Sequence, residues 1–325
     1  MTDAPNIACS QIRRDYFRDR WTLIAPGRAN RTIETAPGPA APAAPTAASC
    51  SFCPGRESET PPAVLRHPPV GDWMIRAFPN LYPALPHAHE VLVETPLHGS
   101  SLAALGPEHL ELVLWALDGR LRTLYRTTQA AWVQAFKNQG AAAGASFGHA
   151  HSQLVATPFV PAEIAVKSAH SHAESCRYCA ICTTEAVGPR SVAANRSFVA
   201  FCPVAPSWEG EVWLLARRHV RHLPRARSAA LSELAALLNR VLRAVEAVTP
   251  AYNMMLFAAA PGMDLHFHVE IAPRREQALK AGLELATGIS VVRQSPEDAA
   301  HAYRRWITEH DTAPRAGTPT QPSPE

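Results

Sequence analysis

Hydrophobic residues recur along the chain in two runs with the spacing of an amphipathic helix. The first run comprises Leu110, Val113, Leu114, Leu117, Leu121 and Leu124, and the second comprises Leu231, Leu234, Leu238, Val241, Leu242 and Val245. Steps of three and four residues place such side chains on one face of a helix. Each run therefore predicts one long helix with a single buried face.

Short apolar runs rich in valine and leucine lie before and after each predicted helix. Residues 90–95 and 211–216 precede the helices, and residues 131–136 and 252–257 follow them. Runs of this length and composition predict buried strands. We expect each part of the chain to be an α+β unit in which the long helix packs on an antiparallel sheet.

Cysteines and histidines recur in the same order around both units. The first copy contains a Cys-x-x-Cys pair, a single histidine and a His-x-His pair, and the second copy repeats them at similar intervals: Cys50, Cys53, His98, His149 and His151, then Cys176, Cys179, His219, His266 and His268. This internal duplication predicts two tandem halves, residues 1–165 and 166–311. Closely spaced prolines exclude a helix or a central strand, so we expect a mobile linker at 35–48 and a disordered tail at 312–325.

The composition narrows the class of protein. The 325 residues are 47% hydrophobic, which is enough for one large core or two smaller cores. Basic and acidic residues number 31 and 28, so the net charge of +3 gives no general reason to expect nucleic acid or an anionic membrane as a partner. The chain has neither a signal-peptide pattern nor an apolar run of about 18 residues. We therefore expect a cytoplasmic protein.

In a reducing compartment, Cys-x-x-Cys pairs indicate metal sites rather than disulfides. Two thiolates and two imidazoles are the ligands of a closed tetrahedral Zn²⁺ site, which has a structural role because no position stays open for water. One predicted set is Cys50, Cys53, His98 and His149, and a second is Cys176, Cys179, His219 and His266. Near the second set, other residues compete as ligands, namely His170, His172, Cys182 and His222.

A further His-x-His pair, His87 and His89, lies in a proline-flanked loop before a predicted strand. We expect both of these side chains to be solvated surface residues.

The segment that carries the chemistry is residues 138–153. In an extended chain His149, His151 and Gln153 share one face, and the preceding Gly140 and Gly144 let the backbone approach a phosphate. A neutral imidazole can attack phosphorus near pH 7. The amide of Gln153 can donate a hydrogen bond to a phosphoryl oxygen but cannot exchange a proton. This arrangement predicts transfer of a nucleotidyl group through a histidine.

Several motifs in this order resemble the galactose-1-phosphate uridylyltransferase family, a branch of the histidine-triad superfamily that also includes ADP-glucose phosphorylase and diadenosine tetraphosphate phosphorylase. The motifs are residues 25–31 (APGRANR), 50–55 (CSFCPG), 78–84 (FPNLYPA), 138–153 (NQGAAAGASFGHAHSQ), 265–270 (LHFHVE) and 281–288 (AGLELATG). The resemblance covers roughly residues 13 to 305. It implies an α+β fold of two tandem histidine-triad-like halves.

The resemblance also implies roles for individual residues. His151 matches the nucleophile, His149 a zinc ligand, and Glu284 a residue that binds sugar hydroxyls. Arg28 and Arg31 match arginines that reach the nucleotide from the neighbouring subunit of a homodimer. The positions that surround the base, the ribose and the α-phosphate are matched by Asn80, Asn138, Gly144, Ser146 and Gln153.

The implied activity is ping-pong transfer of UMP between UDP-glucose, or a related nucleotide sugar, and a hexose 1-phosphate, as in galactose metabolism. Ala150 and Leu283 stand where the family usually has proline and an aromatic residue, and Ser152 stands where many members have glycine. His-x-His-Ser-Gln also occurs in the ADP-glucose phosphorylase branch. A phosphorylase or adenylyltransferase acting on ADP-glucose or a dinucleoside polyphosphate is therefore an alternative.

A third alternative is a non-catalytic, zinc-stabilised nucleotide-binding protein. In the second copy His268 matches His151, but Glu270 stands where Gln153 stands in the first copy. We therefore expect the second copy to be a decayed site that contributes ligands only.

Overall fold

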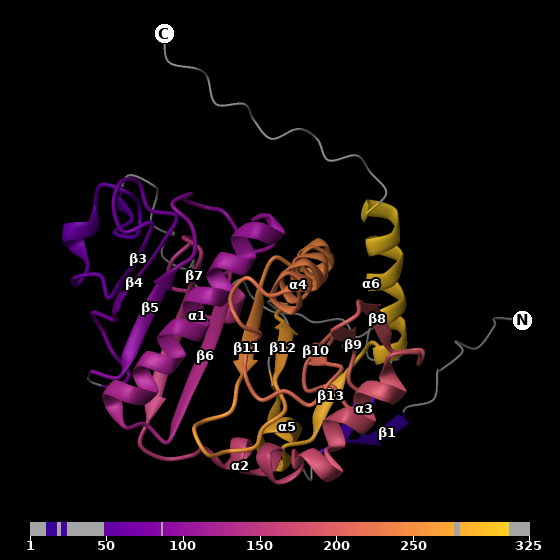
Figure 1. Ribbon diagram of the computed structural model, residues 1–325. Coiled ribbons are helices and arrows are strands. Elements are labelled where there is room, and N and C mark those ends of the chain that lie inside the picture. Colours follow the sequence, from indigo (N-terminus) through magenta and orange to yellow (C-terminus); the bar gives the residue numbers. More distant parts are fainter. Residues whose placement is uncertain (1–10, 18–20, 25–48, 86, 276–279, 312–325) are drawn as a thin grey trace, which may run out of the picture.

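The computed structural model describes residues 11–17, 21–24, 49–85, 87–275 and 280–311 (Figure 1). Arg28 and Arg31, the predicted linker at 35–48 and the predicted tail at 312–325 lie outside these residues. Within the described residues, no helix is both long and apolar enough to cross a membrane.

One antiparallel sheet of ten strands runs through the molecule. From left to right in Figure 1 its order is β3-β4-β5-β7-β6-β11-β12-β10-β9-β8. The strands are β3 Leu65–His67, β4 Ile75–Pro79, β5 His89–Val93, β6 Trp132–Gln139, β7 His151–Thr157, β8 Ser191–Ala194, β9 Phe198–Phe201, β10 Val212–Ala216, β11 Tyr252–Phe257 and β12 His268–Pro273. The β6–β11 pair lies at the centre of the sheet. Counted outward from it, the strands of the first half are β6, β7, β5, β4 and β3, and those of the second half are β11, β12, β10, β9 and β8, so the two orders mirror each other.

The predicted α+β class is confirmed, and the sheets of the two halves are continuous. The halves join because β6 and β11 each leave an edge that the other can pair with, and pairing satisfies their backbone groups. The expected boundary between residues 165 and 166 falls within α2 (Ala162–Ala169). The division into two domains stays a prediction.

Two long helices cover one face of the sheet. They are α1 (Pro107–Thr128) and α4 (Ala229–Val248), which lie side by side and bury the predicted apolar residues against the strands (Figure 1). The helix α6 (Pro296–Asp311) packs beside α4. Ser228 caps α4 by accepting a hydrogen bond from the backbone N–H of Leu231. Both predicted long helices are therefore confirmed.

The opposite face of the sheet is covered differently in the two halves. Over the second half lie α2 and α3 (Arg177–Glu185), which pack on β9, β10 and the end of β11 through a second apolar cluster. Over the first half, a small cluster forms around Cys50, Phe52, Phe78 and Val91. This less covered face carries the candidate site.

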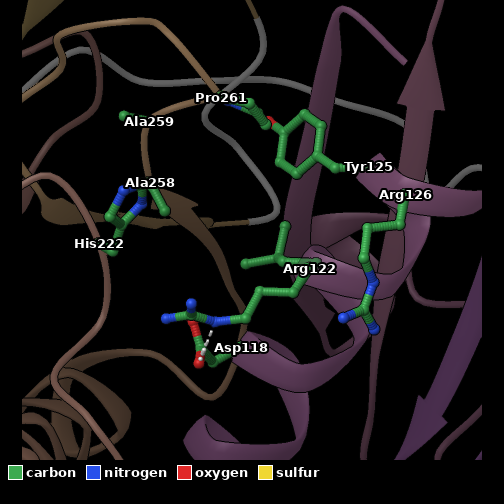
Figure 2. Close-up of a pocket in the computed structure, with 9 residues that line it drawn as sticks. Asp118, Arg122, Tyr125, Arg126, His222, Ala258, Ala259 and Pro261 are labelled. Atoms are coloured by element: carbon green, nitrogen blue, oxygen red, sulfur yellow. Dashed lines mark hydrogen bonds and ion pairs between the residues drawn. The ribbon is translucent and has the colours of Figure 1, made fainter. Parts of the chain in front are cut away.

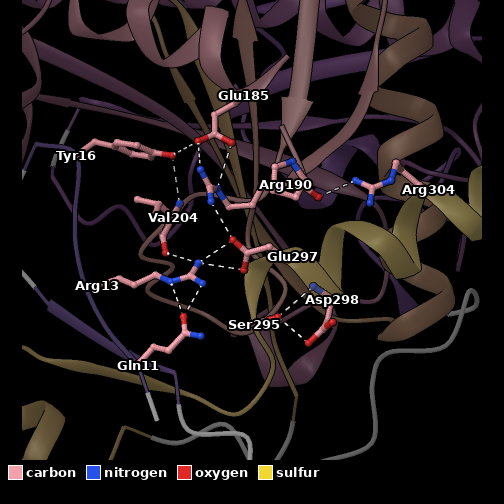
Figure 3. A network of polar contacts seen from close by, with 11 residues as sticks. Gln11, Arg13, Tyr16, Glu185, Arg190, Val204, Ser295, Glu297, Asp298 and Arg304 are labelled. Atoms are coloured by element: carbon pink, nitrogen blue, oxygen red, sulfur yellow. Dashed lines mark hydrogen bonds and ion pairs between the residues drawn. The ribbon is translucent and has the colours of Figure 1, made fainter. Parts of the chain in front are cut away.

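A three-stranded sheet joins the N-terminal segment to the second half. It consists of β1 (Gln11–Arg14), β2 (Trp21–Ile24) and β13 (Ser290–Val292), which follows the short helix α5 (Gly282–Thr287). A polar network supports this junction (Figure 3). The Glu297 carboxylate pairs with Arg13 and Arg190 at 2.9 Å each, and Arg190 also pairs with Glu185 at 2.6 Å. The N-terminal strand is thereby tied to α3 and α6.

Candidate active site and metal centres

His151 lies at the start of β7, on the face of the sheet away from the long helices. Val93 of β5 is its partner in the strand register, and Val91 is the partner of Gln153. Val91 and Val93 belong to the small cluster on that face, whereas Leu154 belongs to the core beneath the helices. Because side chains alternate along a strand, His151 and Gln153 point to the less covered face together.

A hydrogen bond of His151 assigns the tautomer of its imidazole. Nδ1 lies 2.8 Å from the carbonyl oxygen of His149. A carbonyl can only accept, so Nδ1 carries the proton and Nε2 keeps the lone pair. Burial lowers the pKa of His151 below its ordinary value of 6.5, and the charge of Lys137 lowers it further. His151 is therefore neutral near pH 7, with Nε2 able to attack.

The glycine-rich segment before His151 contacts the second half of the chain. Gly140 has φ +77°, and a Cβ there would lie 2.9 Å from the Cβ of Ala251, so glycine is required by both conformation and packing. Asn253 donates through Nδ2 to Asn138 Oδ1 at 2.8 Å and to the carbonyl oxygen of Ala143 at 2.9 Å. The β6–β11 pair thus makes the second half a support for this segment.

Asn80 and Gln153 both lie beside His89. The Nε2 atom of His89 is 2.9 Å from Gln153 Oε1 and 3.2 Å from Asn80 Nδ2. The expectation that His89 is a solvated surface residue is wrong, since the residue is only 7% exposed. His89 begins β5, and the strand's alternation turns it to the face that carries Gln153, whereas His87 in the preceding loop is exposed.

The remaining predicted site residues lie at different places. Ser146 and Gly144 are exposed in the glycine-rich segment. Glu284 accepts hydrogen bonds from the backbone N–H groups of Ala281 at 2.9 Å and Val291 at 3.2 Å, which joins α5 to β13. Among the described residues, no hydrogen bond or ion pair connects Glu284 with His151 or Gln153.

A buried charged cluster, which the sequence did not predict, lies behind His151. Lys137 of β6 pairs with Glu94 at 2.7 Å, and Lys137 Nζ also donates to the carbonyl oxygen of His151 at 3.2 Å. Ser152 donates to the other Glu94 oxygen at 2.6 Å. The available signal was the presence of a lysine and a glutamate within otherwise apolar strand segments, since fully buried charges need a partner.

The first cysteine and histidine set converges on one point. The ligand atoms of Cys50, Cys53, His98 and His149 all lie within 4.8 Å of one another. The Nδ1 atom of His149 is 3.6 Å from both sulfurs, and its Nε2 lies 2.7 Å from the carbonyl oxygen of Thr95. That carbonyl holds the proton on Nε2 and leaves the Nδ1 lone pair directed at the sulfurs, as in metal ligands. This cluster could hold a metal ion.

The second set converges in the same way and leaves out the competing residues. Cys176, Cys179, His219 and His266 have ligand atoms within 4.8 Å, and His170, His172, Cys182 and His222 are not part of this group. His219 Nε2 lies 2.9 Å from Asp264 Oδ1, while its Nδ1 is buried with no hydrogen-bond partner in the described structure. A buried nitrogen without a partner costs free energy unless a metal ion accepts its lone pair. These residues therefore fit a metal ion.

His268, the counterpart of His151 in the second copy, is closed off from solvent. The proton on His268 Nδ1 is donated to the carbonyl oxygen of His266 at 2.7 Å, so the lone pair again lies on Nε2. This Nε2 atom lies 3.3 Å from the ammonium nitrogen of Lys167, which is also paired with Glu270. His268 is fully buried and stacks on Phe257 at 4.5 Å. Lys167 from α2 thus engages the atom that would have to attack.

A pocket of about 360 Å³ lies elsewhere, between α1 and the segment after β11 (Figure 2). Asp118, Arg122 and His222 are among its lining residues, and Arg122 is paired with Asp118 at 2.8 Å. None of the residues around His151 lines this pocket. It is therefore separate from the candidate site.

Comparison with known proteins identifies the family. The family model described as "Domain of unknown function (DUF4921)" matches residues 94–310. The chain belongs to this family. As a DUF4921 protein it is 28% identical over 327 residues to ADP-glucose phosphorylase of Arabidopsis thaliana, with 90% of this chain and 92% of the relative covered. It is 27% identical over 334 residues to galactose-1-phosphate uridylyltransferase of Thermotoga maritima, with 92% and 99% covered.

Comparison with solved structures also finds an ADP-glucose phosphorylase. The structure of ADP-glucose phosphorylase from Arabidopsis thaliana with bound ADP-glucose superposes on this DUF4921 protein with a TM-score of 0.78. The identity is 26%, and the match covers 91% of this chain and 99% of that one. The resemblance to the galactose-1-phosphate uridylyltransferase family is therefore confirmed, and the chain is a member of this nucleotidyltransferase family.

Proposed function

We propose that this protein transfers a nucleoside monophosphate from a nucleotide sugar to a phosphate-bearing acceptor, with a nucleotidyl-His151 intermediate. The observation that carries the proposal is the state of His151. Its Nδ1 proton is held by the carbonyl of His149, its pKa is lowered by burial, and its Nε2 lone pair is available beside the amide of Gln153.

The transfer proceeds in two displacements. In the first, the Nε2 lone pair forms a bond to the α-phosphorus, and the bond from phosphorus to the bridging oxygen breaks. The sugar 1-phosphate leaves with that electron pair and needs no proton, because a phosphate is a weak base. In the second, a phosphate oxygen of the acceptor bonds to the same phosphorus and His151 recovers its lone pair.

Gln153 stabilises the charge that develops on the phosphoryl oxygens. Its amide donates a hydrogen bond but offers no proton and no base, so a bound water is not activated. A single well-aimed donor of this kind contributes about 2.7–4 kcal/mol to transition-state stabilisation. The intermediate is thereby kept for a phosphate acceptor and is protected from hydrolysis.

Two acceptors separate the candidate activities. With inorganic phosphate the product is a nucleoside diphosphate, as for an ADP-glucose phosphorylase, and with a hexose 1-phosphate it is a new nucleotide sugar, as for a galactose-1-phosphate uridylyltransferase. The likeness to the Arabidopsis thaliana structure with bound ADP-glucose supports the first. The match to the Thermotoga maritima uridylyltransferase over 99% of its length supports UDP-glucose and a hexose 1-phosphate as the second candidate.

The two cysteine and histidine clusters are proposed to hold one Zn²⁺ each. Two thiolates and two imidazoles suit Zn²⁺ in a closed tetrahedral site, which contributes to folding free energy and not to the reaction. Cys50, Cys53, His98 and His149 would hold the first ion, and Cys176, Cys179, His219 and His266 the second. Because His149 precedes the nucleophile by two residues, the first ion would also orient the start of β7.

The proposed assembly is a homodimer in which Arg28 and Arg31 of one subunit reach the nucleotide of the other. This part of the proposal rests on the family resemblance, since both arginines lie outside the described residues.

Mass spectrometry of the intact protein tests the proposed function. After incubation with UDP-glucose or with ADP-glucose, the preferred substrate should add one nucleotidyl group, and peptide mapping should place it on His151. Labelled inorganic phosphate or labelled hexose 1-phosphate is then added to the isolated adduct. Formation of labelled nucleoside diphosphate or labelled nucleotide sugar identifies the acceptor. If neither nucleotide sugar forms an adduct, the covalent mechanism is wrong.

A further inference from the structure

His89 is held by hydrogen-bonding groups at both ring nitrogens. The backbone N–H of Ala84 lies 3.0 Å from Nδ1, and Gln153 Oε1 lies 2.9 Å from Nε2. In the strand register His89 pairs with Val155, so Gln153 is its diagonal neighbour on the same face. The imidazole therefore links a loop backbone to the amide that lies beside the nucleophile.

These contacts assign the proton on the imidazole. A backbone N–H can only donate, so Nδ1 must present its lone pair to Ala84. A neutral imidazole then carries its proton on Nε2, and burial keeps the ring neutral by lowering the pKa of His89 from 6.5. The Nε2–H group donates to Gln153 Oε1 without any rearrangement of the groups involved.

Asn80 is consistent with this assignment. Its Oδ1 accepts a hydrogen bond from the backbone N–H of Tyr82 at 2.9 Å, which fixes the orientation of its amide. Its Nδ2, 3.2 Å from His89 Nε2, cannot donate to a nitrogen that carries a proton. Asn80 thus packs against the imidazole and does not compete for the Nε2–H group.

We propose that His89 is a positioning residue for nucleotidyl transfer, because its Nε2–H group holds Gln153 with Oε1 turned away and the NH₂ group directed to the phosphoryl oxygens. This inference rests on the proposed function. An amide has two orientations of nearly the same shape, and only one is productive. The other would place a carbonyl oxygen against the negatively charged phosphoryl oxygens. A fixed donor is what electrostatic stabilisation of a transition state requires.

Two conservative substitutions separate the two hydrogen bonds of His89. In His89→Gln the side-chain NH₂ can occupy the place of Nε2 and still donate to Gln153. In His89→Asn the side-chain oxygen can accept from Ala84, but the shorter side chain cannot reach Gln153. We expect kcat within a few-fold of the original for His89→Gln and lower by on the order of 10²-fold for His89→Asn, which is the effect of losing one oriented donor. KM should change little in either.

The same substitutions in a Gln153→Ala background test whether His89 acts through Gln153. There His89→Asn should cause no further loss of kcat, because no amide remains to be oriented. Thermal stability and metal content are measured for every variant. The proposal is overturned if His89→Asn keeps the wild-type kcat. It is also overturned if His89→Asn lowers kcat as much in the Gln153→Ala background as it does in the wild-type protein. Should His89→Asn fail to fold, a 10²-fold loss in a stably folded His89→Gln variant overturns it instead.

The outcome is separable from that of the proposed function. If the unmodified protein forms no adduct on His151, nucleotidyl transfer itself is wrong and the role of His89 falls with it. If the unmodified protein forms the adduct and turns over, while His89→Asn matches it, only the role of His89 is wrong.

Discussion

Lys137 Nζ lies 2.7 Å from Glu94 Oε2, and both side chains are fully buried directly behind the strand that carries His151. Ser152 and the carbonyl oxygen of His151 complete the hydrogen bonds of this pair. The charges lie between the sheet and the long helices, where solvent cannot replace a lost partner. The position of His151, the proposed nucleophile, therefore depends on a buried ion pair that hydrogen-bonds to its backbone and to Ser152.

Lys137→Met should destabilise the fold, because it leaves the Glu94 carboxylate buried without its partner. Breaking one side of a buried pair typically costs about 3–5 kcal/mol. Denaturant unfolding measures this change in the free energy of unfolding. The matched control is Arg122→Met, which removes the more exposed pair with Asp118 on α1 and should cost less than about 1 kcal/mol. Equal changes in the free energy of unfolding would show that the buried pair stabilises the fold no more than the exposed pair does.

Cys50→Ser should lower the zinc content and the thermal stability together, because a closed metal site contributes directly to folding free energy. Loss of the ion would free His149 and displace His151, and a displacement of about 1 Å costs on the order of 10²-fold in rate. Metal analysis, a melting curve and a transfer assay measure the three effects. Cys202→Ser is the control, since Cys202 is buried outside both clusters and should leave the zinc content unchanged. Fully active protein that is purified without zinc would contradict the prediction.

His151→Gly should abolish turnover and leave the fold intact, because it removes the nucleophile without removing a member of either metal cluster. Added imidazole should restore part of the transfer. His268→Asn, which can keep the hydrogen bond to the His266 carbonyl, should still incorporate one nucleotidyl group per chain, because Lys167 already engages His268. Exchange above about one per cent in His151→Gly, or adduct on His268, would refute the single-nucleophile mechanism.

Gln153→His should slow transfer between phosphate compounds and speed hydrolysis of the intermediate. A histidine at this position can deprotonate water, and such general-base help typically contributes about 10²–10⁴-fold. The measurement is release of free nucleoside monophosphate with no acceptor present. The control is Gln153→Ala, which lacks a base and should not gain hydrolysis. If Gln153→His changes neither hydrolysis nor transfer, Gln153 does not lie at the reacting phosphate.

The amino-acid sequence alone determined the features that follow from local spacing and from the internal repeat. Hydrophobic spacing predicted α1 and α4, and the repeated cysteines and histidines predicted the two clusters that the structure brings together. The shared face of His151 and Gln153 also follows from local geometry, because side chains alternate along any extended segment. For the helices and strands the period carries the information, and for the two clusters the repeated order of cysteines and histidines carries it.

Tertiary structure alone decided which other residues from distant segments surround His151 and His268. His89 was expected in solvent, yet the β5–β7 register makes it the diagonal neighbour of Gln153. The β6–β11 pair brings Asn253 to Asn138, and α2 brings Lys167 to His268. These contacts arise from strand order and helix placement, which depend on how the whole chain buries its apolar surface. No local periodicity specifies them, and for that reason the environment of His151 appeared only in the folded molecule.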